Sequence, residues 1–103
     1  FLETQQDTLN VKAGLLGLSA TLAKEYGKKG ITSNVVSPGF FDTDMTRTTM
    51  SAANRAFWIQ HCPLGRLGRL PELAQLIAFL ASPGAAYING QELRVDGGLG
   101  WAP

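Results

Sequence analysis

The sequence has no excess of charge of either sign and no long apolar run. Nine Lys and Arg nearly balance eight Asp and Glu, so the formal net charge is +1. A chain with this balance offers no basic surface for nucleic acid or for an anionic membrane, and we expect neither as a partner. No stretch approaches the roughly 20 consecutive apolar residues of a membrane span, and the first residues do not resemble a secretory signal.

Cysteine is also nearly absent. Cys62 is the only one, so the chain forms no internal disulfide, which fits a reducing compartment and predicts a cytoplasmic protein. Its place beside Pro63 favours a packing role over a catalytic thiol. His61 precedes it, but no further His or Cys completes a ligand set, and we predict no metal site.

Apolar periodicity predicts two long helices, one from Leu9 to Lys28 and one that begins at Pro71 and runs to Leu80. A third, loosely amphipathic helix is expected over Met45 to Gln60. Gly14 and Gly17 lie inside the first helix, where small residues suggest close approach of another backbone.

Two short segments rich in β-branched or apolar residues are expected to be strands, Ile31 to Ser37 and Gln91 to Val95. Strands that alternate with helices favour an α/β fold with a parallel sheet. Two strands do not make a stable parallel sheet, which needs more neighbours and helices on both faces. We therefore expect residues 1–103 to be the C-terminal portion of a single Rossmann-like domain, a doubly wound parallel sheet.

Several segments, in this order and spacing, resemble the short-chain dehydrogenase/reductase family, most of all its 3-oxoacyl-carrier-protein reductases and sugar-alcohol dehydrogenases. The resemblance runs from about Lys12 to Gly98. It rests on Lys12-Ala13-Gly14-Leu15-Leu16-Gly17-Leu18, Asn34-Val35-Val36-Ser37-Pro38-Gly39, Thr43-Asp44-Met45, Pro63-Leu64-Gly65-Arg66-Leu67-Gly68, Tyr87-Ile88-Asn89-Gly90-Gln91 and Val95-Asp96-Gly97-Gly98.

This resemblance implies an oxidoreductase that moves a hydride between a nicotinamide cofactor, NAD or NADP, and a small carbonyl or alcohol substrate. It covers only the family's C-terminal part, so the Gly-rich dinucleotide turn of the N-terminal half has no counterpart here. The family's first and last helices build subunit interfaces, which implies a homodimer or homotetramer. Gly14 and Gly17 fit such an interface, although a neighbour within the chain would explain them equally well.

The catalytic pair of the family is only half present. Lys12 matches the family's catalytic Lys, which also hydrogen-bonds the nicotinamide ribose and lowers the pKa of a Tyr four residues earlier. Thr8 stands at that spacing, and an alignment with one deletion puts Leu9 there instead. Because neither is a Tyr, the alternative is a non-catalytic relative that serves as a binding or assembly subunit.

The segment after the first strand matches the family better. Pro38, Gly39, Phe41 and Thr43 correspond to positions that contact the nicotinamide carboxamide, Thr43 through its hydroxyl and the others through backbone. The helix that follows corresponds to a mobile substrate lid, with Met45, Met50, Phe57 and Trp58 as its candidate substrate-facing residues; Phe57 and Trp58 could equally be core. His61 is expected at the surface or the edge of this lid rather than as a base, and Asp96-Gly97-Gly98 is expected to form a structural turn that supports a subunit contact.

Overall fold

The structure is a computed structural model that describes the backbone of residues 2–100 and the side chains of residues 14–100. Helices and two short strands alternate along the chain. In order the elements are α1 (Leu2–Tyr26), η1 (Gly27–Lys29), β1 (Val35–Pro38), α2 (Asp44–Thr49), α3 (Ala52–His61), α4 (Leu70–Leu80), η2 (Pro83–Ala85) and β2 (Glu92–Val95).

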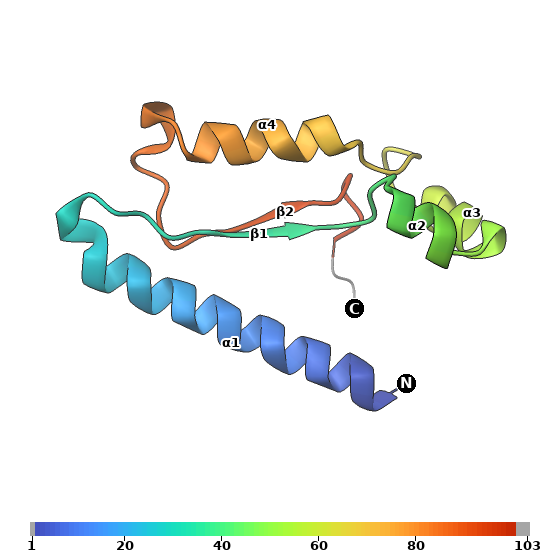
Figure 1. The fold of residues 1–103 in the computed structure, drawn as a ribbon, viewed down its shortest axis with the longest axis horizontal. Helices are drawn as coiled ribbons and strands as arrows, with labels where there is room; N and C mark the ends of the chain where they lie inside the picture. The colour runs from blue at the N-terminus through green and yellow to red at the C-terminus, as the bar shows by residue number, and fades with distance from the viewer. Residues whose placement is uncertain (1, 101–103) are drawn as a thin grey trace.

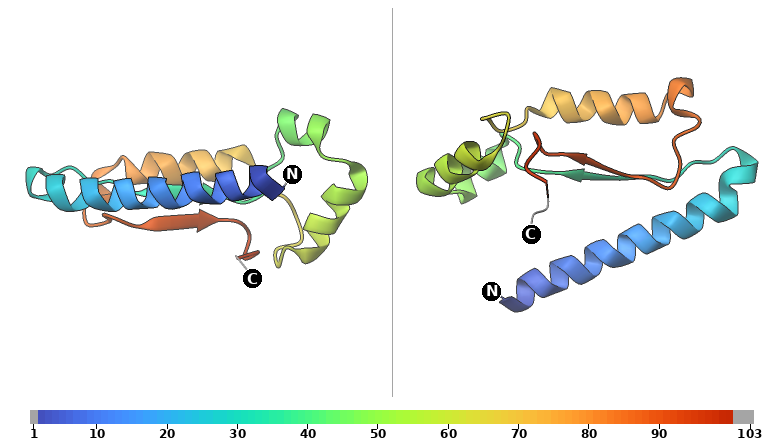
Figure 2. Two further views of the ribbon diagram at one scale, coloured as in Figure 1. Left: turned by 90° about the horizontal axis from the view of Figure 1, so that it is seen from below. Right: turned by 180° about the vertical axis from the view of Figure 1, so that it is seen from behind.

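The two strands form a parallel sheet between two helical layers. Val35 pairs with Glu92 and Pro38 with Val95. Figure 1 shows α4 along one face of the sheet and α1 along the other, and Figure 2 shows the same three layers from below and from behind. This arrangement confirms the predicted α/β fold, a piece of a Rossmann-like sheet with helices on both faces.

The carboxyl ends of both strands point to the same end of the molecule. Helices α2 and α3 lie beyond that end, and α1 runs in the opposite direction to the strands (Figure 1). The N-terminal half of α1 therefore lies toward the strand ends. In open α/β sheets this is where ligands bind, so the fold gathers the segments that carry the family resemblance.

Side-chain hydrogen bonds attach α1 to the segments that precede the two strands. Ser19, which is buried, shares a hydrogen bond of 2.9 Å with the Ser33 hydroxyl, and Asn89 donates its side-chain amide to the Ala23 carbonyl at 3.1 Å. The described core is small and consists of Ala23, Val35, Phe41, Leu67 and Ala85. Larger apolar side chains on α1, Leu15 and Leu18 among them, remain about half exposed.

Three predicted boundaries were wrong. Helix α1 begins at Leu2 rather than Leu9, and it gives way to the tighter turn η1 after Tyr26. The first strand begins at Val35 rather than Ile31, because residues 31–34 form a loop whose polar groups bond to the segment before β2. In that loop the Ser33 N–H donates to the Asn89 side chain at 2.9 Å and the Asn34 side chain donates to the Ile88 carbonyl at 3.1 Å.

The helix expected over Met45 to Gln60 is two helices. Met50 has extended backbone and ends α2, and Ser51 then begins α3 by accepting a hydrogen bond from the Asn54 N–H at 3.1 Å. No helix within residues 2–100 is long and apolar enough to cross a membrane.

Candidate functional site

The segment that follows β1, residues 39–43, forms a tightly anchored turn that we call the strand-end loop. The Gly39 N–H donates to the Val95 carbonyl at 2.9 Å, and the Asp42 N–H donates to the Gly68 carbonyl at 2.8 Å. The Gly68 N–H donates in turn to the Phe40 carbonyl at 3.0 Å. Three backbone hydrogen bonds therefore fix the loop to β2 and to the segment before α4.

Phe41 is the buried anchor of the strand-end loop. Its side chain is 8% exposed, and its ring lies so close to Gly68 that a Cβ on that residue would be 2.6 Å from a ring carbon. The two bonds to Gly68 use the neighbours Phe40 and Asp42, so the N–H and C=O of Phe41 itself point the other way, as along a strand. The group that the resemblance leads us to expect beside this loop is the primary carboxamide of a nicotinamide. A primary carboxamide both donates and accepts hydrogen bonds, so it could pair with the N–H and the C=O of Phe41.

A groove of about 680 Å³ opens beside this loop at the carboxyl ends of the strands. Pro38 and Gly39 line it, together with Arg94 of β2 and Asp96, which follows that strand. Four rings line its other side, and we call them the aromatic cluster: Phe40, Phe57, Trp58 and His61.

The rings of the aromatic cluster contact one another in series. Phe40 stacks on Trp58 with 4.5 Å between ring centroids, Trp58 meets Phe57 edge-on at 5.2 Å, and Phe57 stacks on His61 at 4.0 Å. Such contacts stabilise aromatic pairs beyond their buried area. The cluster joins the strand-end loop to α3 and gives the groove an apolar wall suited to an apolar part of a ligand.

His61 is the polar member of the aromatic cluster. Its Nδ1 lies 2.7 Å from the Phe57 carbonyl oxygen, which can only accept, so Nδ1 carries a proton. In the neutral ring Nε2 is then the acceptor. His61 therefore adds one hydrogen-bonding atom to a largely apolar wall.

Thr43 ends the strand-end loop and begins α2. Its side-chain oxygen accepts a hydrogen bond from the Thr46 N–H at 3.1 Å, and its hydroxyl also lies 2.9 Å from that of Thr46. Thr43 is therefore the N-cap of α2. The capping bond uses the oxygen as acceptor and fixes the rotamer of the hydroxyl.

The carboxylate of Asp42 contacts both of the following helices. Arg47 of α2 donates its Nε–H to one carboxylate oxygen at 3.0 Å, and Arg55 of α3 reaches the same oxygen at 3.5 Å. The hydrogen bond from Arg47, with the positive charges of both guanidinium groups, lowers the pKa of Asp42.

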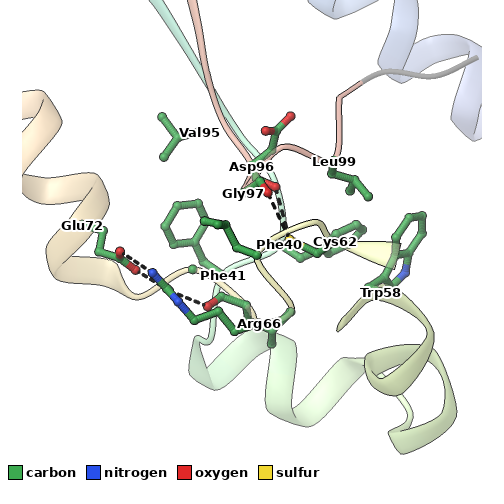
Figure 3. Close-up of a pocket in the computed structure, with 13 residues that line it drawn as sticks. Phe40, Phe41, Trp58, Cys62, Arg66, Glu72, Val95, Asp96, Gly97 and Leu99 are labelled. Carbon is green, nitrogen blue, oxygen red and sulfur yellow. Dashed lines mark hydrogen bonds and ion pairs between the residues drawn. The ribbon is translucent and has the colours of Figure 1, made fainter. Parts of the chain in front are cut away.

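A smaller cavity of about 110 Å³ is lined by Phe40 and Phe41 of the strand-end loop and by residues of the segment 62–68 (Figure 3). Arg66 forms a two-point ion pair with Glu72, with nitrogen–oxygen distances of 2.7 and 2.8 Å. Glu72 also accepts from the Arg69 N–H at 2.9 Å, which caps α4. The Arg66 guanidinium and this backbone bond lower the pKa of Glu72 from 4.5 to about 2.

Cys62 and Asp96 both line this cavity and contact each other. The Cys62 thiol lies 3.7 Å from the Asp96 carbonyl oxygen and 3.6 Å from that of Gly97, so it packs against the end of β2. The Asp96 carboxylate accepts hydrogen bonds of 3.0 Å from the N–H groups of Gly98 and Gly100. Asp96 therefore forms the structural turn that the sequence predicts.

The predicted site residues divide into four groups. Pro38, Gly39, Phe57 and Trp58 line the groove, while Phe41 and Thr43 fix the loop beside it. Met45 and Met50 are absent from the groove lining within the described part of the chain. Lys12, Thr8 and Leu9 fall on the backbone of α1, and their side chains lie outside the described residues. Among residues 14–100, no group of three His, Cys, Asp or Glu side chains could hold a metal ion.

Phe40 and Asp42 also belong to the site, and neither was predicted from the sequence. The alternation of an extended segment would have suggested them, because residues 40 and 42 share one side of the loop and 41 takes the other. Their partners, Trp58 and Arg55, are 18 and 13 residues away and follow no local spacing.

Comparison with known proteins identifies relatives over nearly the whole chain. The family model described as enoyl-(acyl carrier protein) reductase matches residues 3–100. The chain is 53% identical over 88 residues to the 3-oxoacyl-[acyl-carrier-protein] reductase FabG of Escherichia coli (strain K12), which covers 85% of this chain and 36% of that protein. It is 50% identical to the enzyme of that name from Pseudomonas aeruginosa, covering 85% of this chain and 35% of that protein. The chain thus spans about a third of the length of these relatives.

Proposed function

Because the chain belongs to the short-chain dehydrogenase/reductase family, we propose that it provides the nicotinamide-facing and substrate-facing part of an NAD(P)-dependent oxidoreductase. The reaction is hydride transfer between the cofactor and a carbonyl or alcohol. The observation that carries the proposal is the rigid strand-end loop beside an apolar groove, at the carboxyl ends of parallel strands.

The strand-end loop suits the carboxamide of a nicotinamide. Pro38, Gly39, Phe41 and Thr43 would hold that group, Phe41 through its backbone N–H and C=O and Thr43 at the start of α2. Lys12 would hydrogen-bond the ribose from α1. When bound, the nicotinamide ring supplies or accepts the hydride, and the chain's own residues orient it. Whether the cofactor is NAD or NADP depends on residues outside this segment.

The groove suits a substrate that carries a carbonyl on an apolar chain. The relatives' name points to a 3-oxoacyl group on acyl carrier protein, and the aromatic cluster offers such a chain an apolar wall. Helices α2 and α3 act as the substrate lid. Phe57 and Trp58 face the substrate, while Met45 and Met50 belong to the outer part of the lid.

Proton transfer is the weak step of this site. Neither Thr8 nor Leu9 carries a phenol, so Lys12 has no acidic hydroxyl four residues away to activate. We expect slow turnover in which the binding groups and Lys12 remain functional. A protein that binds nicotinamide but transfers no hydride would instead be the binding or assembly subunit that the missing Tyr suggests.

We further propose a cytoplasmic homodimer or homotetramer in which α1 contributes to a subunit contact. A Cβ added at Gly14 or Gly17 would meet no atom within 4 Å in the described structure, so the predicted close approach is not made within it. Leu15 and Leu18 on the same helix are also exposed, which is typical of surfaces that contact another chain.

Turnover by the full-length protein tests the proposal. NADH and NADPH oxidation is followed with 3-oxoacyl thioesters and with a panel of simple ketones. We expect measurable turnover, and we expect Lys12→Ala to lower kcat/KM by about 100-fold. The matched control is Lys24→Ala, an exposed lysine of the same helix, which should leave kcat/KM unchanged. Turnover unaffected by Lys12→Ala, or none with any substrate, would overturn the catalytic proposal.

A further inference from the structure

The backbone at Asp42 is fixed by contacts with the segment before α4. Its N–H is bonded to Gly68, and its neighbour Phe41 is buried beneath that glycine. A carboxylate fixed in this way is a rigid reference point for whatever contacts it. The two groups that do so are guanidinium groups from different helices, Arg47 of α2 and Arg55 of α3.

Two residues of the strand-end loop contact two residues of α3. Phe40 and Asp42 are two residues apart in an extended segment, so their side chains share one side while Phe41 turns inward. On α3 the partners are Trp58 and Arg55, three residues apart and therefore on one helix face. Helix α3 is thus held at two points, one aromatic and one ionic.

We propose that Asp42 is a positioning residue whose carboxylate holds α2 and α3 in place. In doing so it keeps the rings of α3 that belong to the aromatic cluster beside the groove. The proposal rests on the proposed function in taking that groove as the substrate site. Without Asp42, only the stacking of Phe40 on Trp58 remains of the two-point contact, and two guanidinium groups face each other without their shared counter-charge. The lowered pKa of Asp42 agrees with a carboxylate that stays ionised between the two arginines.

Exposed ion pairs contribute little on average, so the effect to be measured is modest. Asp42 and Arg55 are each a little over one-third exposed. The distinguishing feature is that one carboxylate serves two helices. Asp44 provides the matched control, because its carboxylate is 98% exposed and contacts only Arg47 within α2 among the described residues.

Hydrogen exchange measured by mass spectrometry on the full-length protein tests this without relying on activity. In Asp42→Asn, the amides of residues 52–61 should exchange about two- to fivefold faster than in the wild type, and in Asp44→Asn they should not change. Asp42→Glu should restore part of the protection. Arg55→Gln removes only the contact with α3, so it should also speed this exchange but by no more than Asp42→Asn does, and the double variant should exchange no faster than Asp42→Asn.

Kinetics supply the second measurement. We expect Asp42→Asn to raise KM for the carbonyl substrate by about the same factor as the exchange, with kcat and the KM for cofactor unchanged. Unchanged exchange over residues 52–61 in Asp42→Asn, or an equal effect of Asp44→Asn, would overturn the positioning role. If the wild type shows no turnover, the proposed function fails while the exchange data still decide the role of Asp42.

Discussion

Gly39 lies directly against Asp96, so closely that a Cβ added at Gly39 would be 2.7 Å from the Asp96 Cβ and 2.9 Å from its Cα. This contact joins the ends of the two strands beneath the groove. The Gly39 N–H bond to Val95 lies beside it. The position of the strand-end loop therefore depends on a residue with no side chain at this point.

Gly39→Ala should disturb both the fold and the site. The new methyl group must displace Asp96 backbone rather than a flexible side chain, so we expect the free energy of unfolding to fall by about 1–3 kcal/mol. Cofactor binding should weaken with it. Denaturant unfolding and a fluorescence titration with NADH and NADPH measure the two effects.

The control for this variant is Gly14→Ala, where the added methyl meets nothing within 4 Å. A helix-interior alanine there should stabilise the protein by at most about 1 kcal/mol. A Gly39→Ala protein that is as stable as the wild type and binds cofactor equally would contradict the close packing described here.

The ion pair between Arg66 and Glu72 predicts a particular pH dependence of stability. The pKa of Glu72 is lowered in the folded protein, so its contribution is fully present above 4.5 and is lost as the pH falls toward 2. Glu72→Gln should therefore lower Tm by a few degrees at about pH 7 and by less at about pH 3, which lies within the range over which the contribution is being lost. Arg66→Gln should reproduce this pattern. A Tm difference that is equal at both pH values would show that the carboxylate contributes nothing through its charge.

The outer face of α1 predicts a subunit contact that tolerates only small residues. Gly17→Leu should dissociate the oligomer of the full-length protein, because leucine fills the space that a second helix would occupy. Gly17→Ala is the control with a small side chain at the same position, and it should leave the oligomer intact. Analytical ultracentrifugation distinguishes the two, and an unchanged mass for Gly17→Leu would exclude this face from the interface.

A tyrosine restored before Lys12 should accelerate the reaction. A phenol in the correct place supplies general acid–base catalysis, for which we expect a gain in kcat of about 100-fold or more. Thr8→Tyr and Leu9→Tyr test the two alignments, and only one should show the gain. The paired variants Thr8→Phe and Leu9→Phe add the ring without the hydroxyl and should gain nothing. If neither tyrosine raises kcat, Lys12 does not occupy the family's catalytic position.

Local patterns predicted the fold class because each element carries its own signal. Helix α4 has the apolar stripe of Leu73, Leu76 and Leu80, and the second strand was expected within one residue of its observed start. The first strand was overestimated because Ile31 looks like a strand residue, yet the polar groups of Ser33 and Asn34 bond to a segment more than fifty residues away. Such long-range pairs leave no trace in periodicity.

The break between α2 and α3 could have been read from the sequence. Ser51 precedes Asn54 by three residues, the spacing at which a hydroxyl caps the next helix, and the structure shows that bond. The contacts of Arg47 and Arg55 with Asp42 could not be predicted from the sequence, because they depend on how α3 packs relative to the strand-end loop. The resemblance named the loop residues as candidates, which stay a prediction, and it gave no sign of the contacts that fix the loop.

Hydride transfer itself is the most direct test of the proposed function. The full-length protein is incubated with NADH or NADPH carrying deuterium at the transferable position and with a 3-oxoacyl thioester, and the product is examined by mass spectrometry. We expect a hydroxyacyl product that carries the deuterium at the former carbonyl carbon, and we expect that label to be lost in Lys12→Ala. Cofactor that binds while no deuterium reaches any carbonyl substrate would contradict it and identify the protein as a non-catalytic member of its family.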